Sequence, residues 1–263
     1  MHFTENDFVF QLFKKAIAGY GFVISSITDD ERVCVVKGDF ELTVSLDNLR
    51  KEFSQENDEN VISEFAEAIA SAGEEIPTWE VAKDKVFPSL FPSDYDYGEF
   101  VNFPVTELFN TVFVYEEKLS KKWIDEAQVE KWSIDNETLV RHANVNLDKE
   151  VEKASLEIEL IEGKKLGLLE TTEETKKSAF LLSKKLKDKV RKELGWPIYA
   201  VIPVRDFVYL FSEEDSEFFI ERVGGVVLQE YNESGYPITT EILKCTDDGI
   251  IAIGKYANDE EES

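Results

Sequence analysis

The feature that most constrains this chain is an alternation between two hydrophobic periods. In the second half, pairs of short stretches with alternating polar and apolar residues are separated by longer stretches with a helical period. The predicted hairpins cover 155–171, 198–211 and 238–255, and the helices between them cover 172–194 and 213–231. Because a hairpin joins neighbouring antiparallel strands, this pattern predicts an α+β fold. We expect mainly antiparallel sheets built from helix–hairpin units, with the helices on one face.

The first half of the chain has a different pattern, in which helices flank a run of strands. The expected order is a helix over 4–18, strands over 20–28, 31–37 and 39–46, a helix over 58–72, a strand over 109–118, and helices over 125–131 and 135–150. The segment 87–104 holds three prolines and six aromatic residues, which predicts an irregular but packed crossing. We place a boundary just before it and expect two domains, residues 1–84 and 85–263.

The charge of the chain limits its partners. The sequence has 263 residues with 55 acidic and 29 basic side chains, a net charge of −26. Sequence-independent binding of nucleic acid needs Lys and Arg to neutralise phosphates, so we do not expect it. The sequence has no long uncharged apolar run, so we expect no membrane span. The first residues lack the basic start of a secretory signal. These features favour an intracellular protein.

The few cysteines and histidines give no recognisable metal or cofactor motif. Cys34 and Cys245 each lie in an apolar run, which is typical of buried thiols. With only His2 and His142 besides them, no close-spaced zinc pattern can form. We therefore predict neither a metal nor a cofactor.

Several short motifs in a fixed order resemble a known family. They are Val86-Phe87-Pro88, Phe113-Val114-Tyr115, Ala143-Asn144-Val145-Asn146-Leu147, Ile202-Pro203-Val204-Arg205-Asp206-Phe207 and Gly235-Tyr236-Pro237-Ile238-Thr239. Over residues 86–255 the chain resembles the YtpQ-like bacterial proteins, a family with a domain of unknown function. The resemblance implies a soluble bacterial cytoplasmic protein, with no established activity and no catalytic residues to transfer.

One predicted hairpin carries acids that suggest an enzymatic alternative. Glu157, Glu159 and Glu170 lie on adjacent strands of hairpin 155–171, with Lys164 and Lys165 at its turn. Carboxylates and lysine on neighbouring strands occur in metal-dependent nucleases. The competing interpretation, which we favour, is a solvated strand face with alternating charge.

Three further polar positions have both a structural and a binding interpretation. Arg205 and Asp206 occupy a predicted tight turn after Pro203, where Asp commonly bonds its own backbone. Asn146, late in the predicted helix 135–150, is suited to bonding the backbone of a neighbouring element. In each case the structural interpretation is favoured over ligand binding.

The segment 176–192 is the one basic part of the chain. It has eight Lys or Arg residues against one Asp, on a predicted helix. The favoured interpretation is that these cations pair with acidic neighbours of the same chain. Docking of an acidic partner, phosphate or a membrane surface is the alternative.

These observations leave three classes of function. The favoured one is a non-enzymatic binding or regulatory protein whose acidic segments, 52–80 and 212–233, meet a basic partner; an immunity protein is a special case. The alternative is a carboxylate- or Mg²⁺-dependent hydrolase, nuclease-like, using the acids of hairpin 155–171. The third is a scaffold whose open sheet face packs on itself in a homodimer.

Overall fold

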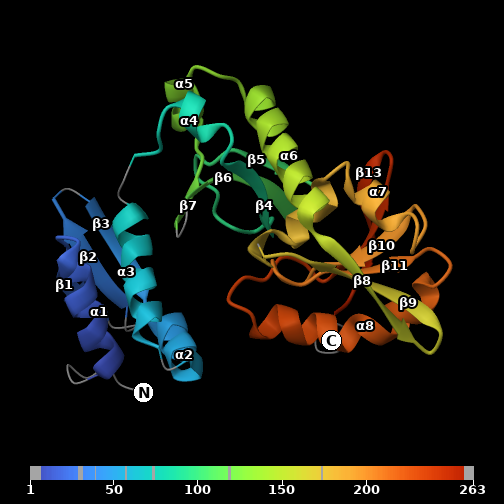
Figure 1. Ribbon diagram of the computed structural model, residues 1–263, viewed down its shortest axis with the longest axis horizontal. Helices are drawn as coiled ribbons and strands as arrows, with labels where there is room; N and C mark the ends of the chain where they lie inside the picture. Colours follow the sequence, from blue (N-terminus) through green and yellow to red (C-terminus); the bar gives the residue numbers. More distant parts are fainter. Residues whose placement is uncertain are drawn as a thin grey trace. The chain divides into compact units, whose positions relative to one another are not determined.

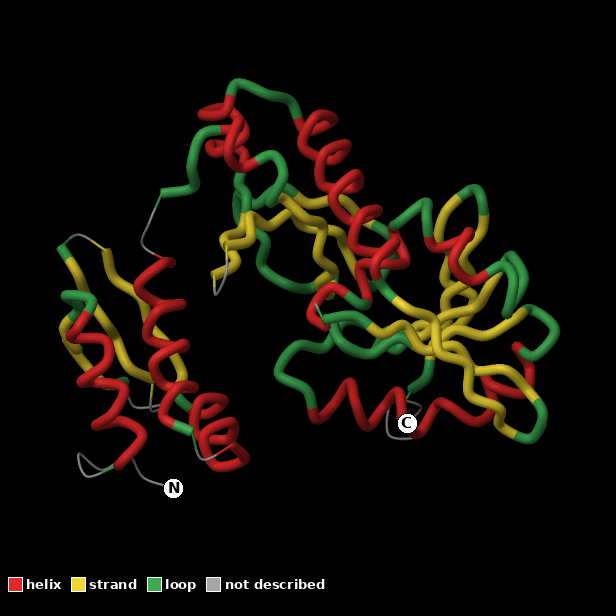
Figure 2. The backbone as a smooth tube through the Cα atoms, viewed as in Figure 1, coloured by secondary structure: helices red, strands yellow, loops and turns green. Residues whose placement is uncertain are grey.

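The α+β fold with antiparallel sheets is confirmed. The computed structural model describes residues 7–28, 32–38, 40–56, 58–72, 75–117, 120–172 and 174–257. Within these residues the strands form antiparallel sheets of three, six and four strands (Figures 1 and 2). The chain divides into two compact units, Met1–Pro77 with Glu116–Lys122, and Thr78–Tyr115 with Trp123–Ser263. Each unit is described by itself below.

The first unit packs helices against a three-stranded sheet. Its elements are α1 (Phe8–Gly19), β1 (Val23–Ile27), β2 (Arg32–Lys37), β3 (Phe40–Ser45), α2 (Asp47–Glu56) and α3 (Glu59–Ala72). The strands lie in sequence order, and the core joins Phe13 and Ile17 of α1, Val33 and Val35 of β2, and Ile62 of α3. The predicted helix 58–72 and strands match these elements closely, whereas α2 was not predicted.

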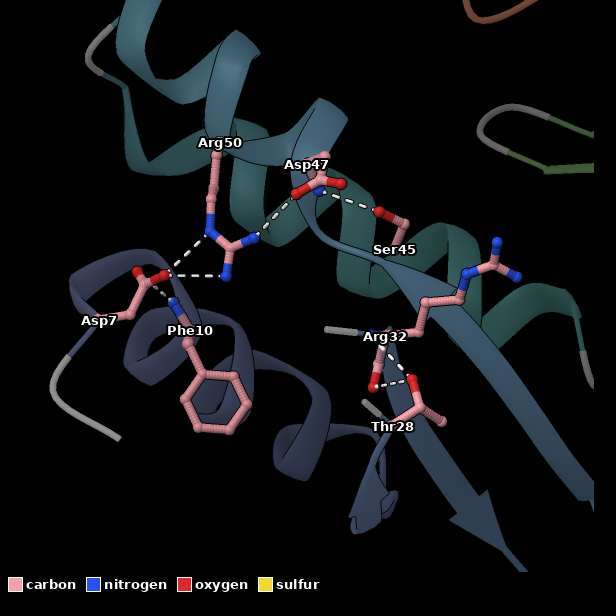
Figure 3. Close-up of polar contacts among 7 residues, drawn as sticks. All are labelled: Asp7, Phe10, Thr28, Arg32, Ser45, Asp47 and Arg50. Carbon is pink, nitrogen blue, oxygen red and sulfur yellow. Dashed lines mark hydrogen bonds and ion pairs between the residues drawn. The ribbon is translucent and has the colours of Figure 1, made fainter. Parts of the chain in front are cut away.

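An arginine of α2 joins this helix to the start of α1 (Figure 3). Asp7 is the N-cap of α1, and its carboxylate accepts a hydrogen bond from the Phe10 amide at 3.2 Å. The same carboxylate accepts from Nε of Arg50 at 2.9 Å, and Arg50 also bonds Asp47 at 3.1 Å. The helix therefore begins at a capped Asp7; the first residues of the predicted helix 4–18 lie outside the described part.

The segment 87–104, predicted as irregular, contributes two strands to the four-stranded sheet, most of which belongs to the second unit. The sheet contains β4 (Val86–Pro92), β5 (Asn102–Pro104), β6 (Phe109–Glu117) and β7 (Ser120–Trp123). Its order is β4-β6-β5, and β7 also pairs with β6. Pro88 and Pro92 fit because β4 is an edge strand, where a missing amide proton costs no ladder bond. The prediction failed because it treated the prolines as strand breakers without knowing the strand's place in the sheet.

Three helices accompany the four-stranded sheet. They are α4 (Trp79–Ala82), α5 (Glu126–Trp132) and α6 (Asn136–Lys153). Asp135 caps α6 by accepting from the Thr138 amide at 2.8 Å. The helix packs against β4 through fully buried residues on one side, among them Leu139, Ala143 and Leu147. The predicted helices 125–131 and 135–150 correspond to α5 and α6.

The remaining strands form the six-stranded sheet from three hairpins, at the positions predicted. They are β8 (Ser155–Ile161), β9 (Lys164–Glu170), β10 (Ile198–Val201), β11 (Tyr209–Ser212), β12 (Glu241–Thr246) and β13 (Gly249–Lys255), in the order β13-β12-β10-β11-β9-β8. Glu162 and Gly163 both have positive φ, 53° and 82°, as a two-residue type I′ turn requires.

Helical segments cover both faces of this six-stranded sheet, whereas the prediction placed the helices on one face. Helix α8 (Ser216–Glu233) packs on one face through Phe219, Val223 and Val227. The opposite face contributes to the main core of the unit, where Leu243 joins Leu186 of α7 (Leu186–Val190). Within the described residues, no helix is both long and apolar enough to span a bilayer.

The predicted helix 172–194 is wrong, and with it the single basic helix 176–192. The described part of the segment forms the 3₁₀ turns η1 (Glu174–Lys176) and η2 (Ser178–Leu182), then the short α7. The break lies at Ser183, which is extended, accepts from the Lys185 amide at 3.1 Å and donates to Asp148 at 2.6 Å. A hydroxyl that bonds its own backbone competes with helix formation.

The cations of the same segment pair mostly within the chain, as the favoured interpretation proposed. Lys177 bonds Glu170 at 3.3 Å, Lys185 bonds Glu152 at 2.8 Å, and Lys187 bonds Asp247 at 2.7 Å. These contacts tie the segment to β9, α6 and the β12–β13 turn.

Candidate ligand-binding pocket

An apolar cavity of about 560 Å³ lies between the four-stranded sheet and the first half of α6. Its lining residues are Phe103, Thr111, Phe113, Asn136, Glu137, Val140, Asn144 and Leu182. We call it the first cavity. A mostly apolar cavity with a few converging polar groups is the usual form of a small-ligand or side-chain site.

The register of the sheet and the period of the helix explain why these residues meet. Phe103 of β5 pairs with Thr111 of β6, and Phe113 follows two residues later, so all three face the same side. On α6, Asn136, Val140 and Asn144 are four residues apart and share one side. Helix α6 packs mainly on β4, and the first cavity lies between the first half of α6 and side chains of β5 and β6.

The polar groups at the first cavity include an exposed carboxylate and a buried hydrogen-bond acceptor. The Asn136 amide donates to Glu126 at 3.0 Å, while its own Oδ1 is buried and finds no partner within the described chain. Glu137 is exposed and makes no ion pair with the other described residues. None of the lining residues is Lys, Arg or His. The site therefore suits a group with an apolar body and a hydrogen-bond-donating or cationic end.

A second cavity of about 680 Å³ adjoins the first through Leu182, which lines both. Its walls are residues 104–105, 181–184 and 245–250 together with Lys187 and Trp196. Asp247 is already engaged there, since it accepts from Lys187 at 2.7 Å and from the Trp196 indole at 3.0 Å. The neighbouring Lys187 accordingly holds the pKa of the Asp247 carboxyl below its usual range.

The three glutamates of hairpin 155–171 share a sheet face but do not converge on one point. Glu157 and Glu159 are exposed on β8, the edge strand, and pair with Leu168 and Leu166 of β9. Glu170 instead bonds Lys177. In the described part of the chain, no cluster of three or more Asp, Glu, His or Cys could hold a metal ion. The geometry gives the carboxylate- or Mg²⁺-dependent alternative no support.

Arg205 lies between aromatic rings rather than against a carboxylate. Its guanidinium carbon is 3.8 Å from the ring centre of Tyr236 and 5.8 Å from that of Phe91. Burial lowers the pKa of this guanidinium, although Tyr236 and Asp206 oppose the shift. Asp206 is exposed at the turn, and the expected bond from its side chain to its own backbone is absent among the described contacts.

The hydrogen bonds of Asn146 support its structural interpretation. Its amide donates to the carbonyls of Lys83 at 2.8 Å and Val86 at 3.0 Å, and its oxygen accepts from Lys149 at 3.2 Å. The residue is 3% exposed and ties α6 to the start of β4. It does not line either cavity.

Most of the aromatic residues of segment 87–104 pack around a tryptophan that follows in the chain. Phe91, Tyr95 and Phe100 have ring centres 4.4, 5.2 and 4.9 Å from that of Trp123. Tyr97 donates to the Phe91 carbonyl at 3.2 Å, and burial raises its pKa to about 12. The segment is packed, as predicted.

The two cysteines are both buried and unpaired with each other. Cys34 donates to Glu41 at 2.9 Å, and burial raises the pKa of Cys245 to about 12. A thiol with such a pKa is protonated and inert at neutral pH.

The first cavity was not found from the sequence. Its one local signal is the set Asn136, Val140 and Asn144, two amides flanking an apolar residue on a single helix side. That signal is not specific, because the partner surface comes from strands that the prolines of segment 87–104 concealed.

No family model, no curated protein and no solved structure matches this chain. The resemblance to the YtpQ-like proteins therefore stays a prediction.

Proposed function

We propose that this chain is a non-enzymatic binding or regulatory protein of the bacterial cytoplasm that recognises a basic partner. The observation that carries the proposal is the first cavity, whose apolar lining is bordered by an unpaired carboxylate and an unused buried acceptor, with no cation. A YtpQ-like protein and an immunity-type inhibitor both remain within this proposal. The unpaired, buried cysteines are consistent with a reducing compartment.

A lysine or arginine of the partner fits the chemistry of the first cavity. The aliphatic stem of such a side chain would contact Phe103, Phe113 and Val140. Its charged end would reach the exposed carboxylate of Glu137 at the border. Long cationic side chains commonly bury their stems in this way while the head stays polar.

The acidic surface supports encounter with a basic partner. Glu59, Glu64 and Glu67 of α3 are exposed and make no ion pairs among the described residues. Together with the net charge of −26, such acids raise the rate of association with a cationic protein. This contribution is screened by salt, since the Debye length is about 10 Å at 0.1 M.

A matched pair of variants tests the proposal. Val140→Arg puts a bulky cation in the first cavity, whereas Val226→Arg adds the same charge on the exposed side of α8. Tagged wild-type protein and both variants would be incubated with native lysate at low salt and at about 0.5 M salt, where the Debye length falls below about 5 Å. We expect a basic protein bound stoichiometrically to the wild type and to Val226→Arg at low salt. It should be lost from Val140→Arg, and lost from all three proteins at high salt.

Two results would contradict the proposal. One is retention of no basic protein under any condition. The other is equal retention by Val140→Arg and wild type, which would separate binding from the first cavity. Light scattering of the free protein distinguishes the 30.1 kDa monomer from a homodimer of twice that mass, which is the scaffold hypothesis.

A further inference from the structure

We infer that the basic partner is recognised through an extended segment that spans both cavities, with Lys or Arg in the first and a large apolar side chain in the second. This inference rests on the proposed function and specifies the partner for the same site. Its physical basis is the continuity of the two cavities and the difference in charge between them.

The two cavities share Leu182 and lie along the end of β5, and we take them as one groove. Phe103 lines the first cavity, and the next residues, Pro104 and Val105, line the second. On the other side Leu182 belongs to both, and Ser183 and Lys184 continue the wall. Because consecutive residues form each wall, the groove follows the local direction of the chain.

An extended ligand suits this groove better than a helix. Within the four-stranded sheet, β5 has a single strand neighbour, β6, so its other edge is unpaired in the described structure. Extended peptides commonly add to such an edge, with alternate side chains entering pockets. Alternate side chains on one face of a strand are spaced by about 7 Å.

The charges distinguish the two positions. At the first cavity Glu137 is unpaired and no lining residue is basic. At the second, Lys184 and Asp248 make no ion pairs with the described residues, so unpaired charges of both signs line it, and Asp247 is already held by Lys187 and Trp196. A cation is therefore favoured at the first position. At the second, the apolar surface of Val105, Leu181 and Ile250 favours an apolar side chain.

Short labelled peptides test this arrangement directly. The probes are acetylated, amidated peptides holding Arg and Trp separated by one, two or three glycines, with Arg→Glu and Trp→Ser counterparts. Fluorescence anisotropy of each would be measured with wild type, Val140→Arg, Ile250→Arg and Val226→Arg. Substitution on the peptide leaves the protein fold untouched, and thermal unfolding checks that each variant is folded.

The expected result is a dependence on both peptide residues. At the best spacing, the Arg–Trp peptide should bind at least about tenfold more tightly than either counterpart, which corresponds to about 1.4 kcal/mol. Val140→Arg and Ile250→Arg should each weaken it by a similar factor, and Val226→Arg should not.

The outcomes separate the two proposals. If Arg→Glu peptides bind as well as Arg peptides, the basic-partner function fails. If Arg matters but Trp→Ser and Ile250→Arg have no effect, the function stands and the two-cavity segment is overturned. Tighter binding of a helix-stabilised peptide with the same residues would also overturn the extended segment.

Discussion

The two halves of helix α6 use similar residues for different purposes. In its second half, Asn146 is buried with every polar atom of its side chain bonded, and Leu147 is fully buried in the main core. In its first half, Asn136 keeps a buried oxygen without a partner in the described chain, and Val140 lines an open cavity. The difference shows that a buried amide stabilises a fold where its partners are supplied, and leaves an acceptor for a further group where they are missing.

The largest expected difference is in stability, between variants that shorten a buried or a cavity-lining apolar side chain of α6 to alanine. Leu147→Ala removes a side chain that is 0% exposed, so it should lower the free energy of unfolding by about 3 kcal/mol. Val140→Ala, on the cavity side, should cost less than about 1 kcal/mol because the side chain is only partly buried. Urea denaturation of both variants measures the contrast. Equal losses would show that the first cavity is closed and packed.

A second contrast compares two asparagines. Asn146→Ala leaves the Lys83 and Val86 carbonyls without their donor and should cost about 2 kcal/mol of unfolding free energy. Asn146→Asp should be as harmful, since a carboxylate cannot donate. Asn144→Ala should change stability by less than about 0.5 kcal/mol. Thermal and urea unfolding of the three variants would decide this, and a harmful Asn144→Ala would contradict the assignment.

The first half of α6 should instead matter for binding. Glu137→Gln removes the one charge among the described residues that line the first cavity. We expect the Arg–Trp peptide to bind about three- to fivefold more weakly, as an exposed ion pair allows, with no larger change in unfolding midpoint than in the control below, since both glutamates lie in the first turn of a helix. Glu217→Gln on α8 makes the same charge change elsewhere and is the control. A similar loss in both variants would indicate general steering rather than a local contact.

The smallest expected effect is on pH dependence at the helix start. Hydrogen bonds from Thr138 lower the pKa of the Asp135 carboxyl in the folded protein. A lowered folded-state pKa contributes stability above the unfolded value of about 3.9, and this is lost as pH falls through the folded value. Asp135→Asn keeps a capping oxygen but does not titrate. Asp135→Asn should therefore have a lower free energy of unfolding than wild type near neutral pH. In urea titrations this difference should shrink as pH falls below about 4. A deficit that grows there would reverse the assigned sign.

The sequence by itself determined the elements whose signal is local. The hairpin of β8 and β9 was predicted because alternation sets its faces and Gly163 permits its turn, and α3 because its apolar period is strong. The class of fold and the antiparallel sheets follow from such local signals.

Only the tertiary structure decided the features that depend on distant partners. Ser183 breaks the basic segment through Asp148 of α6, and Pro88 lies in a strand because that strand is an edge of its sheet. The first cavity forms where side chains of α6, β5 and β6 meet without filling the space between them. Periodicity and composition do not specify which strand lies at an edge or which side chain lacks a partner, because both depend on residues far apart in the chain.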